Sequence, residues 1–97
     1  MDSLSAAAPA AVRAILRKGP MSPGKLRLAW RIVVGAAMDR ATSVALADDA
    51  CVEVTAEDAS WRREVKRSQS EILTRLRYLV GEDALKKIRV VTKPARP

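Results

Sequence analysis

Residues 51–80, CVEVTAEDASWRREVKRSQSEILTRLRYLV, decide the fold that the sequence predicts. Their first part alternates, so Val52, Val54 and Ala56 point to one side of an extended strand. The remainder carries the longest helical pattern of the chain, because its apolar residues recur at helical spacings. That apolar stripe consists of Trp61, Val65, Ile72, Leu76 and Leu79. We expect it to face the core of the protein.

The same helical stretch predicts a basic surface. With residues placed at about 100° around the helix axis, five cations share an arc of roughly 140° that contains no acidic residue. Glu64 and Glu71 fall beyond its edge. The basic arc consists of Arg62, Arg63, Lys66, Arg67 and Arg77. Such a cluster is either a solvated face or a contact surface for a polyanion.

The net charge of +7 is concentrated in the C-terminal part of the chain. Residues 1–57 hold seven Lys/Arg and six Asp/Glu, a net +1, whereas residues 58–97 hold eleven and five, a net +6. This asymmetry favours a nucleic acid or an acidic protein surface as the partner. Beyond the arc, the candidate phosphate contacts are Lys87, Arg89 and Lys93.

Composition excludes several classes of function. A chain of 97 residues without histidine cannot form the usual zinc or haem sites, and its single Cys51 cannot form an intrachain disulfide. We therefore expect no enzyme, metal, cofactor or small-molecule substrate. The most apolar window, residues 26–38, contains two arginines and is shorter than a membrane span. The expected location is the cytoplasm, without membrane contact.

The N-terminal part predicts two helices. The first covers residues 6–18 and ends at Gly19, and the second begins after Ser22 and continues to about residue 38. The second helix is apolar on two sides, so we expect the sheet on its Trp30 side and the first helix on its opposite, Ile32 side. A glycine inside a helix, Gly35, predicts a close crossing there.

Three strands complete the predicted fold. Residues 42–46 and 51–56 form a hairpin around an Asp-Asp turn, and residues 87–92 form the third strand. The order is α-α-β-β-α-β, an α+β fold arranged as a small K-homology-like sandwich. Its three-stranded antiparallel sheet carries the helices on one face. The core anchors are Trp30, Gly35 and Trp61.

Four segments resemble the signatures of one bacterial family. These are WRIVVG at residues 30–35, SWRREV at 60–65, ILTRL at 72–76 and KIRV at 87–90. Their order and spacing across residues 25–92 are similar to those of the DciA family of replicative helicase loaders. The resemblance implies a K-homology-like fold, binding to a DnaB-type helicase, and affinity for single-stranded or forked DNA.

The predicted organisation is therefore an N-terminal helix with a frayed end at residues 1–20, a DciA-like domain at 21–92, and a basic disordered tail at 93–97. The predicted function is that of a non-enzymatic accessory protein that binds nucleic acid and the helicase. One alternative is a K-homology-like RNA-binding module, although the chain lacks the Gly-x-x-Gly loop that clamps RNA. The other alternative is a pure protein-interaction domain.

Overall fold

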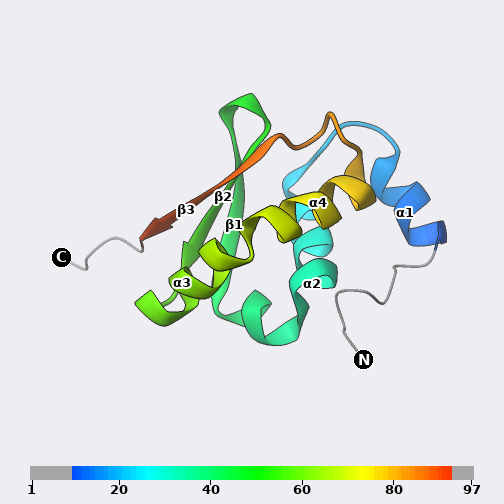
Figure 1. Ribbon diagram of the computed structural model, residues 1–97. Coiled ribbons are helices and arrows are strands. Elements are labelled where there is room, and N and C mark those ends of the chain that lie inside the picture. The colour runs from blue at the N-terminus through cyan, green and yellow to red at the C-terminus, as the bar shows by residue number, and fades with distance from the viewer. Residues whose placement is uncertain (1–9, 93–97) are drawn as a thin grey trace.

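The computed structural model describes residues 10–92, so the predicted tail and the start of the chain lie outside the described residues. The fold is α+β, as predicted, with helices packed against a three-stranded sheet (Figure 1). Among the described residues, no helix is both long and apolar enough to cross a membrane. The elements are α1 (Ala10–Arg17), α2 (Pro23–Arg40), β1 (Thr42–Ala47), the 3-10 turn η1 (Asp48–Ala50), β2 (Cys51–Ala56), α3 (Ala59–Arg67), α4 (Gln69–Val80) and β3 (Lys87–Thr92).

The predicted long helix is two helices, so the observed order is α-α-β-β-α-α-β. Ser68 leaves the helical conformation with φ −98° and ψ 8°, and its N–H bonds back to the carbonyls of Glu64 and Val65, where α3 ends. The Gln69 side chain then donates to the Ile88 carbonyl at 2.8 Å. Figure 1 shows that α4 leaves this break in a new direction.

The sheet has the order β1-β2-β3, and its two pairings differ in direction. β1 and β2 form the predicted hairpin, in which Val44 lies opposite Val54. β2 and β3 are parallel, with Val54 opposite Val90, so the expectation of a fully antiparallel sheet was wrong. The reason is the length of the crossover. α3 and α4 carry the chain back to the hairpin end of β2, where Lys86 N donates to the Ala50 carbonyl at 2.8 Å.

The core lies between one face of this sheet and the helices. Val52 and Val54 are fully buried on the helix face, and Trp30 of α2 is 1% exposed. Most of the predicted stripe joins this core, namely Val65, Ile72, Leu76 and Leu79. Trp61 differs from the expectation, because it is only partly buried and lies outside the core cluster. Trp30, and not Trp61, therefore anchors the core.

Gly35 serves a different purpose from the predicted one. A Cβ added at this position would meet nothing within 4 Å, so no other element crosses closely there. Its backbone has φ 87° and ψ 169°, a combination that only glycine adopts without strain. Gly35 therefore breaks the regular helix inside α2 and redirects its last turns.

Helix α1 packs against α4, whereas the sequence predicted that it would lie on the Ile32 side of α2. Arg13 Nε donates to the Tyr78 carbonyl at 3.0 Å, and Arg17 Nη2 donates to the same oxygen at 2.9 Å. Leu16 of α1 is buried in the core cluster. The last turn of α4 leaves carbonyls without helical partners, and the two arginines satisfy the one at Tyr78.

Candidate nucleic-acid interface and apolar groove

The position of α3 is fixed at its first turn and by one buried side chain. Asp58 Oδ1 accepts a hydrogen bond from Trp61 N at 2.9 Å, which caps the helix. Val65 is fully buried against the sheet. Because residues around a helix are separated by about 100°, Arg63 and Arg67 then point away from Val65 toward solvent.

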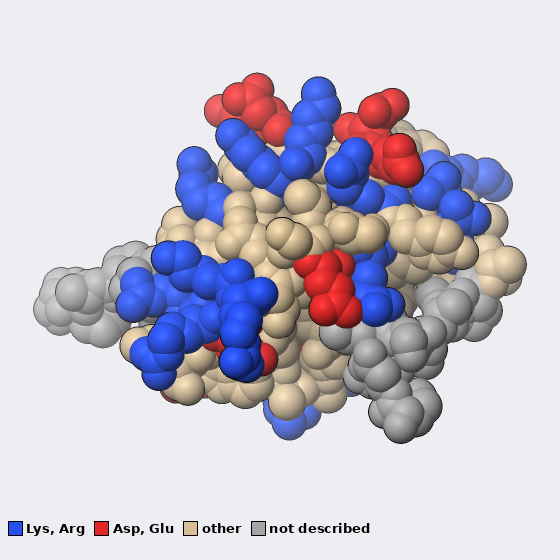
Figure 2. Space-filling view, in the orientation of Figure 1, with Lys and Arg blue, Asp and Glu red and all other residues tan. Residues whose placement is uncertain are grey.

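Lys and Arg side chains gather over α3, at the lower left of the view in Figure 2. Arg63 and Lys66 are exposed, and the described residues offer neither an ion-pair partner. Arg67 Nη2 lies 2.6 Å from Glu64 Oε1. This hydrogen bond and the carboxylate charge raise the pKa of Arg67 above its ordinary value. We call Arg63, Lys66 and Arg67 the α3 cation surface.

The structure separates the other two members of the predicted arc from this surface. Arg62 is partly buried and is engaged in an interaction of its own. Arg77 lies near the end of α4, ten residues beyond Arg67. Ten helical residues correspond to about 15 Å along a helix axis. Its Nε donates to the Glu82 carbonyl at 3.3 Å. The break at Ser68 interrupts the single cylinder on which the arc was drawn.

The three remaining cation candidates lie on or beyond β3. Lys87, the first residue of β3, is exposed, and Lys93 lies outside the described residues. Arg89 is exposed on the sheet face opposite the helices and forms an ion pair with Glu53 of β2. The hydrogen bond to Glu53 raises the pKa of Arg89 above its ordinary value. Arg89 therefore has a carboxylate partner already, unlike Arg63 and Lys66.

An apolar groove of about 350 Å³ opens between the last part of α2 and the first turn of α3. The partly buried indole of Trp61 forms one wall. The other lining residues are Val34, Ala37, Met38, Ser60 and Glu64. Because Gly35 redirects α2 at this point, the groove is a consequence of the break in that helix. Sequence reasoning missed it by assigning Trp61 to the core.

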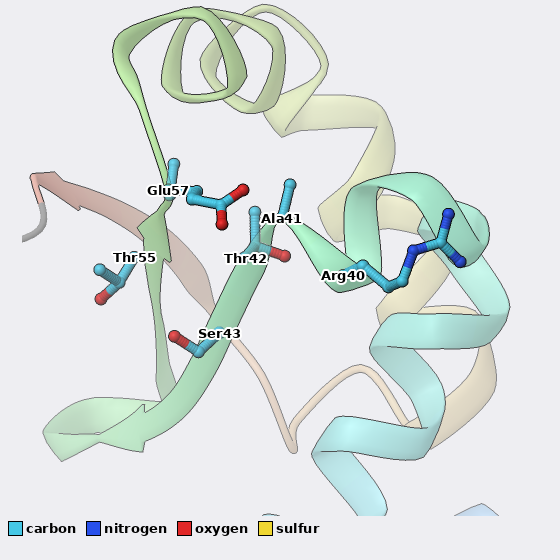
Figure 3. A pocket seen from close by; sticks show the side chains of 7 residues that line it. Arg40, Ala41, Thr42, Ser43, Thr55 and Glu57 are labelled. Carbon is cyan, nitrogen blue, oxygen red and sulfur yellow. The ribbon is translucent and has the colours of Figure 1, made fainter.

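A smaller, polar depression of about 140 Å³ lies where β1 and β2 meet the end of α2 (Figure 3). The hydroxyl groups of Ser43 and Thr55 lie on neighbouring strands, and the Arg40 guanidinium points away from them. The described residues contain no group of three or more His, Cys, Asp or Glu side chains that could hold a metal ion. The carboxylate of Glu57 also lines this depression.

A protein-family model matches residues 3–90 of the chain, and its description is "Dna[CI] antecedent, DciA". The chain belongs to the DciA family. No curated protein and no solved structure matched it. DciA proteins are helicase loaders or accessories in DNA replication, and the family is not known for catalysis. The matched range includes α1, which the sequence had placed outside the DciA-like domain.

One signal in the sequence of this DciA-family chain could have revealed the groove. Asp58 is a strong cap residue, which places Trp61 in the first turn of α3. Side chains at the end of an element have neighbours on fewer sides than those in its middle. A large indole there is therefore more accessible than the same residue at the centre of a stripe, as Trp30 is in α2.

Proposed function

We propose that this DciA-family chain is a non-enzymatic accessory of a DnaB-type replicative helicase and that it binds single-stranded or forked DNA. The observation that carries the proposal is the α3 cation surface, where Arg63 and Lys66 are exposed. Uncompensated cations of this kind bind phosphate without reading sequence. Family membership supplies the replication context. The K-homology-like character of the fold remains part of this proposal.

The aromatic residues favour phosphate contacts over base stacking. Tyr78 is 53% exposed, but the Arg13 guanidinium lies over its ring, 4.2 Å from the centroid. Trp61 has only part of its ring accessible, inside the groove. With little stacking, binding should depend strongly on salt and weakly on base sequence.

A competing explanation for the cations is local stabilisation of the helix. Lys66 and Arg67 lie in the last turn of α3, where positive charge complements the helix dipole. Arg63 lies in the middle of α3, where the dipole gives no such benefit. In addition, Arg63 and Arg67 repel each other at four-residue spacing. Helix stability therefore does not account for the whole surface.

The DNA test neutralises two cations on α3 and compares them with a matched pair on α2. Arg63→Gln with Lys66→Gln should weaken single-stranded DNA binding and reduce the slope of log affinity against log salt by about 0.7 for each phosphate that is no longer neutralised. Arg27→Gln with Arg31→Gln removes the same charge from exposed positions on α2. Fluorescence titration at several salt concentrations provides both quantities.

The matched pair makes the result specific. If both double variants lose affinity equally, net charge alone attracts DNA and α3 is no interface. If neither changes the salt slope, the α3 cation surface is a solvated face, and the proposed DNA binding fails. Circular dichroism of each variant verifies that the fold is retained.

We further propose that the helicase occupies the Trp61 groove. The groove combines an accessible indole with apolar walls, and aromatic side chains in such depressions dominate the binding energy of protein interfaces. Trp61→Ala should abolish retention of the host's replicative helicase in a pull-down. Tyr78→Ala, a change at an exposed aromatic residue outside the groove, should leave it intact. Equal retention by both variants would move the helicase contact elsewhere.

A further inference from the structure

The outer edge of β1 presents backbone groups that the sheet does not use. Glu57 N donates to the Ala41 carbonyl at 2.8 Å, and these residues lie opposite each other when the β1–β2 register is continued by one position. Opposed residues of an antiparallel ladder alternate between hydrogen-bonded and non-bonded pairs. Ser43, Ala45 and Ala47 therefore bond to β2. The intervening residues turn their N–H and C=O groups toward the open edge, and these are Thr42, Val44 and Leu46.

No backbone hydrogen bond within the described part of the chain engages those outward groups. The other edge of the sheet, formed by β3, is protected against pairing with a further strand. Gln69 Nε2 donates to the Ile88 carbonyl on β3, and Lys87 and Arg89 place charges along that strand. β1, with the sequence TSVALA, has no charge, no proline and no bulge in its pairing. Such an edge is suited to pairing with another strand.

The residues that flank the two ends of β1 carry opposite charges. Arg40 precedes the strand and Asp48 follows it, and both are exposed. In an antiparallel pair of two β1 strands centred on Val44, Thr42 lies opposite Leu46 of the second copy. Continued outward, the same register brings Arg40 of each copy beside Asp48 of the other. This register also joins residues whose free N–H and C=O groups face each other.

We propose that β1 pairs antiparallel with β1 of a second copy of this chain, which joins the two sheets into one across a two-fold axis. The three bonded residue pairs contribute about six backbone hydrogen bonds. Leu46, now 37% exposed on the helix side, is covered by the partner strand. The contact area of one strand pair is small, so the dimer forms at high protein concentration and dissociates on dilution. The two-fold axis makes the interface isologous.

The experiment exchanges the charges at the two ends of β1. In a homodimer of either Arg40→Asp or Asp48→Arg, like charges face each other at both ends, so each variant alone should be monomeric where the wild type dimerises. A mixture of the two variants restores an opposite-charge pair at both ends of the heterodimer. Sedimentation velocity should show dimer in the wild type, monomer in each variant, and dimer in the mixture.

Three outcomes of this experiment would overturn the proposal. A wild-type chain that stays monomeric to millimolar concentration overturns the proposal. So does a dimer that both variants retain, because its interface then lies away from the ends of β1. Failure of the mixture to dimerise also overturns the proposed register. Both substitutions are at exposed positions, and thermal melts of the variants verify folding. Neither position belongs to the α3 cation surface or the Trp61 groove, so the proposed function stands or falls separately.

Discussion

The indole Nε1 of Trp30 donates a hydrogen bond to Oγ1 of Thr42 at 3.0 Å, and the same hydroxyl donates to the Met38 carbonyl at 2.7 Å. This relay joins the middle of α2, its last turns and the first residue of β1. Trp30 can thus be buried in the core while its polar N–H keeps a partner. The hydroxyl of Thr42 is what makes a tryptophan acceptable at this position.

Removing that hydroxyl should therefore destabilise the protein. Thr42→Val keeps the shape of the side chain but leaves the Trp30 N–H without an acceptor, which costs about 1–3 kcal/mol. Thr42→Ser retains the hydroxyl and should cost clearly less. Urea denaturation followed by tryptophan fluorescence measures both free energies of unfolding. Equal stability of the valine and serine variants would show that the hydrogen bond contributes nothing.

The two tryptophans should respond differently to truncation. Trp30→Ala removes a side chain that is 1% exposed, and the cavity should cost about 3–5 kcal/mol. Trp61→Ala removes a partly buried ring outside the core cluster and should cost about 1–2 kcal/mol. Thermal melts give the comparison. If Trp61→Ala unfolds the protein as readily as Trp30→Ala, Trp61 belongs to the core after all.

Gly35 should not tolerate any other residue, although space is available. Gly35→Ala forces a side chain into φ 87° and ψ 169° and should cost about 1–3 kcal/mol. Gly24, near the start of the same helix, is the control, because a Cβ there also meets nothing within 4 Å and its φ is not positive. Gly24→Ala should be neutral or stabilising by up to about 1 kcal/mol. Identical melting temperatures for the two variants would refute the backbone argument.

In the hairpin turn, an alanine occupies a backbone conformation in which glycine is preferred. Ala50 has φ 56°, in the left-handed region that costs an L-residue about 1–2 kcal/mol. Ala50→Gly should raise the free energy of unfolding by about 0.5–1 kcal/mol, after the greater freedom of glycine in the unfolded chain is deducted. Ala47→Gly, at a φ of −104°, should instead lower it. A destabilised Ala50→Gly protein would contradict this reasoning.

Periodicity was sufficient to predict most elements of this fold, although not the division of the long helix into α3 and α4. The alternation of Val52, Val54 and Ala56 identified a strand with one buried face, and all three are buried. The spacing of Val65, Ile72, Leu76 and Leu79 identified the face of the helical region that meets the core. These patterns succeed because the side of an element to which a residue points depends on local geometry, namely the two-residue repeat of a strand and the 3.6-residue repeat of a helix. The order of the family segments likewise identified the DciA family.

The tertiary structure decided the properties that depend on packing between distant segments. The break at Ser68 coincides with the contact between Gln69 and Ile88, nineteen residues away, and it divides the cations that a single helix would have united. The direction of β3 was set by the return of α3 and α4 to the hairpin end of the sheet. Whether a tryptophan lies in the core or along a groove depends on what surrounds it on every side. Trp30 is surrounded by the sheet and the Thr42 hydroxyl, which accepts its N–H. Trp61 instead borders the groove left by the redirected end of α2.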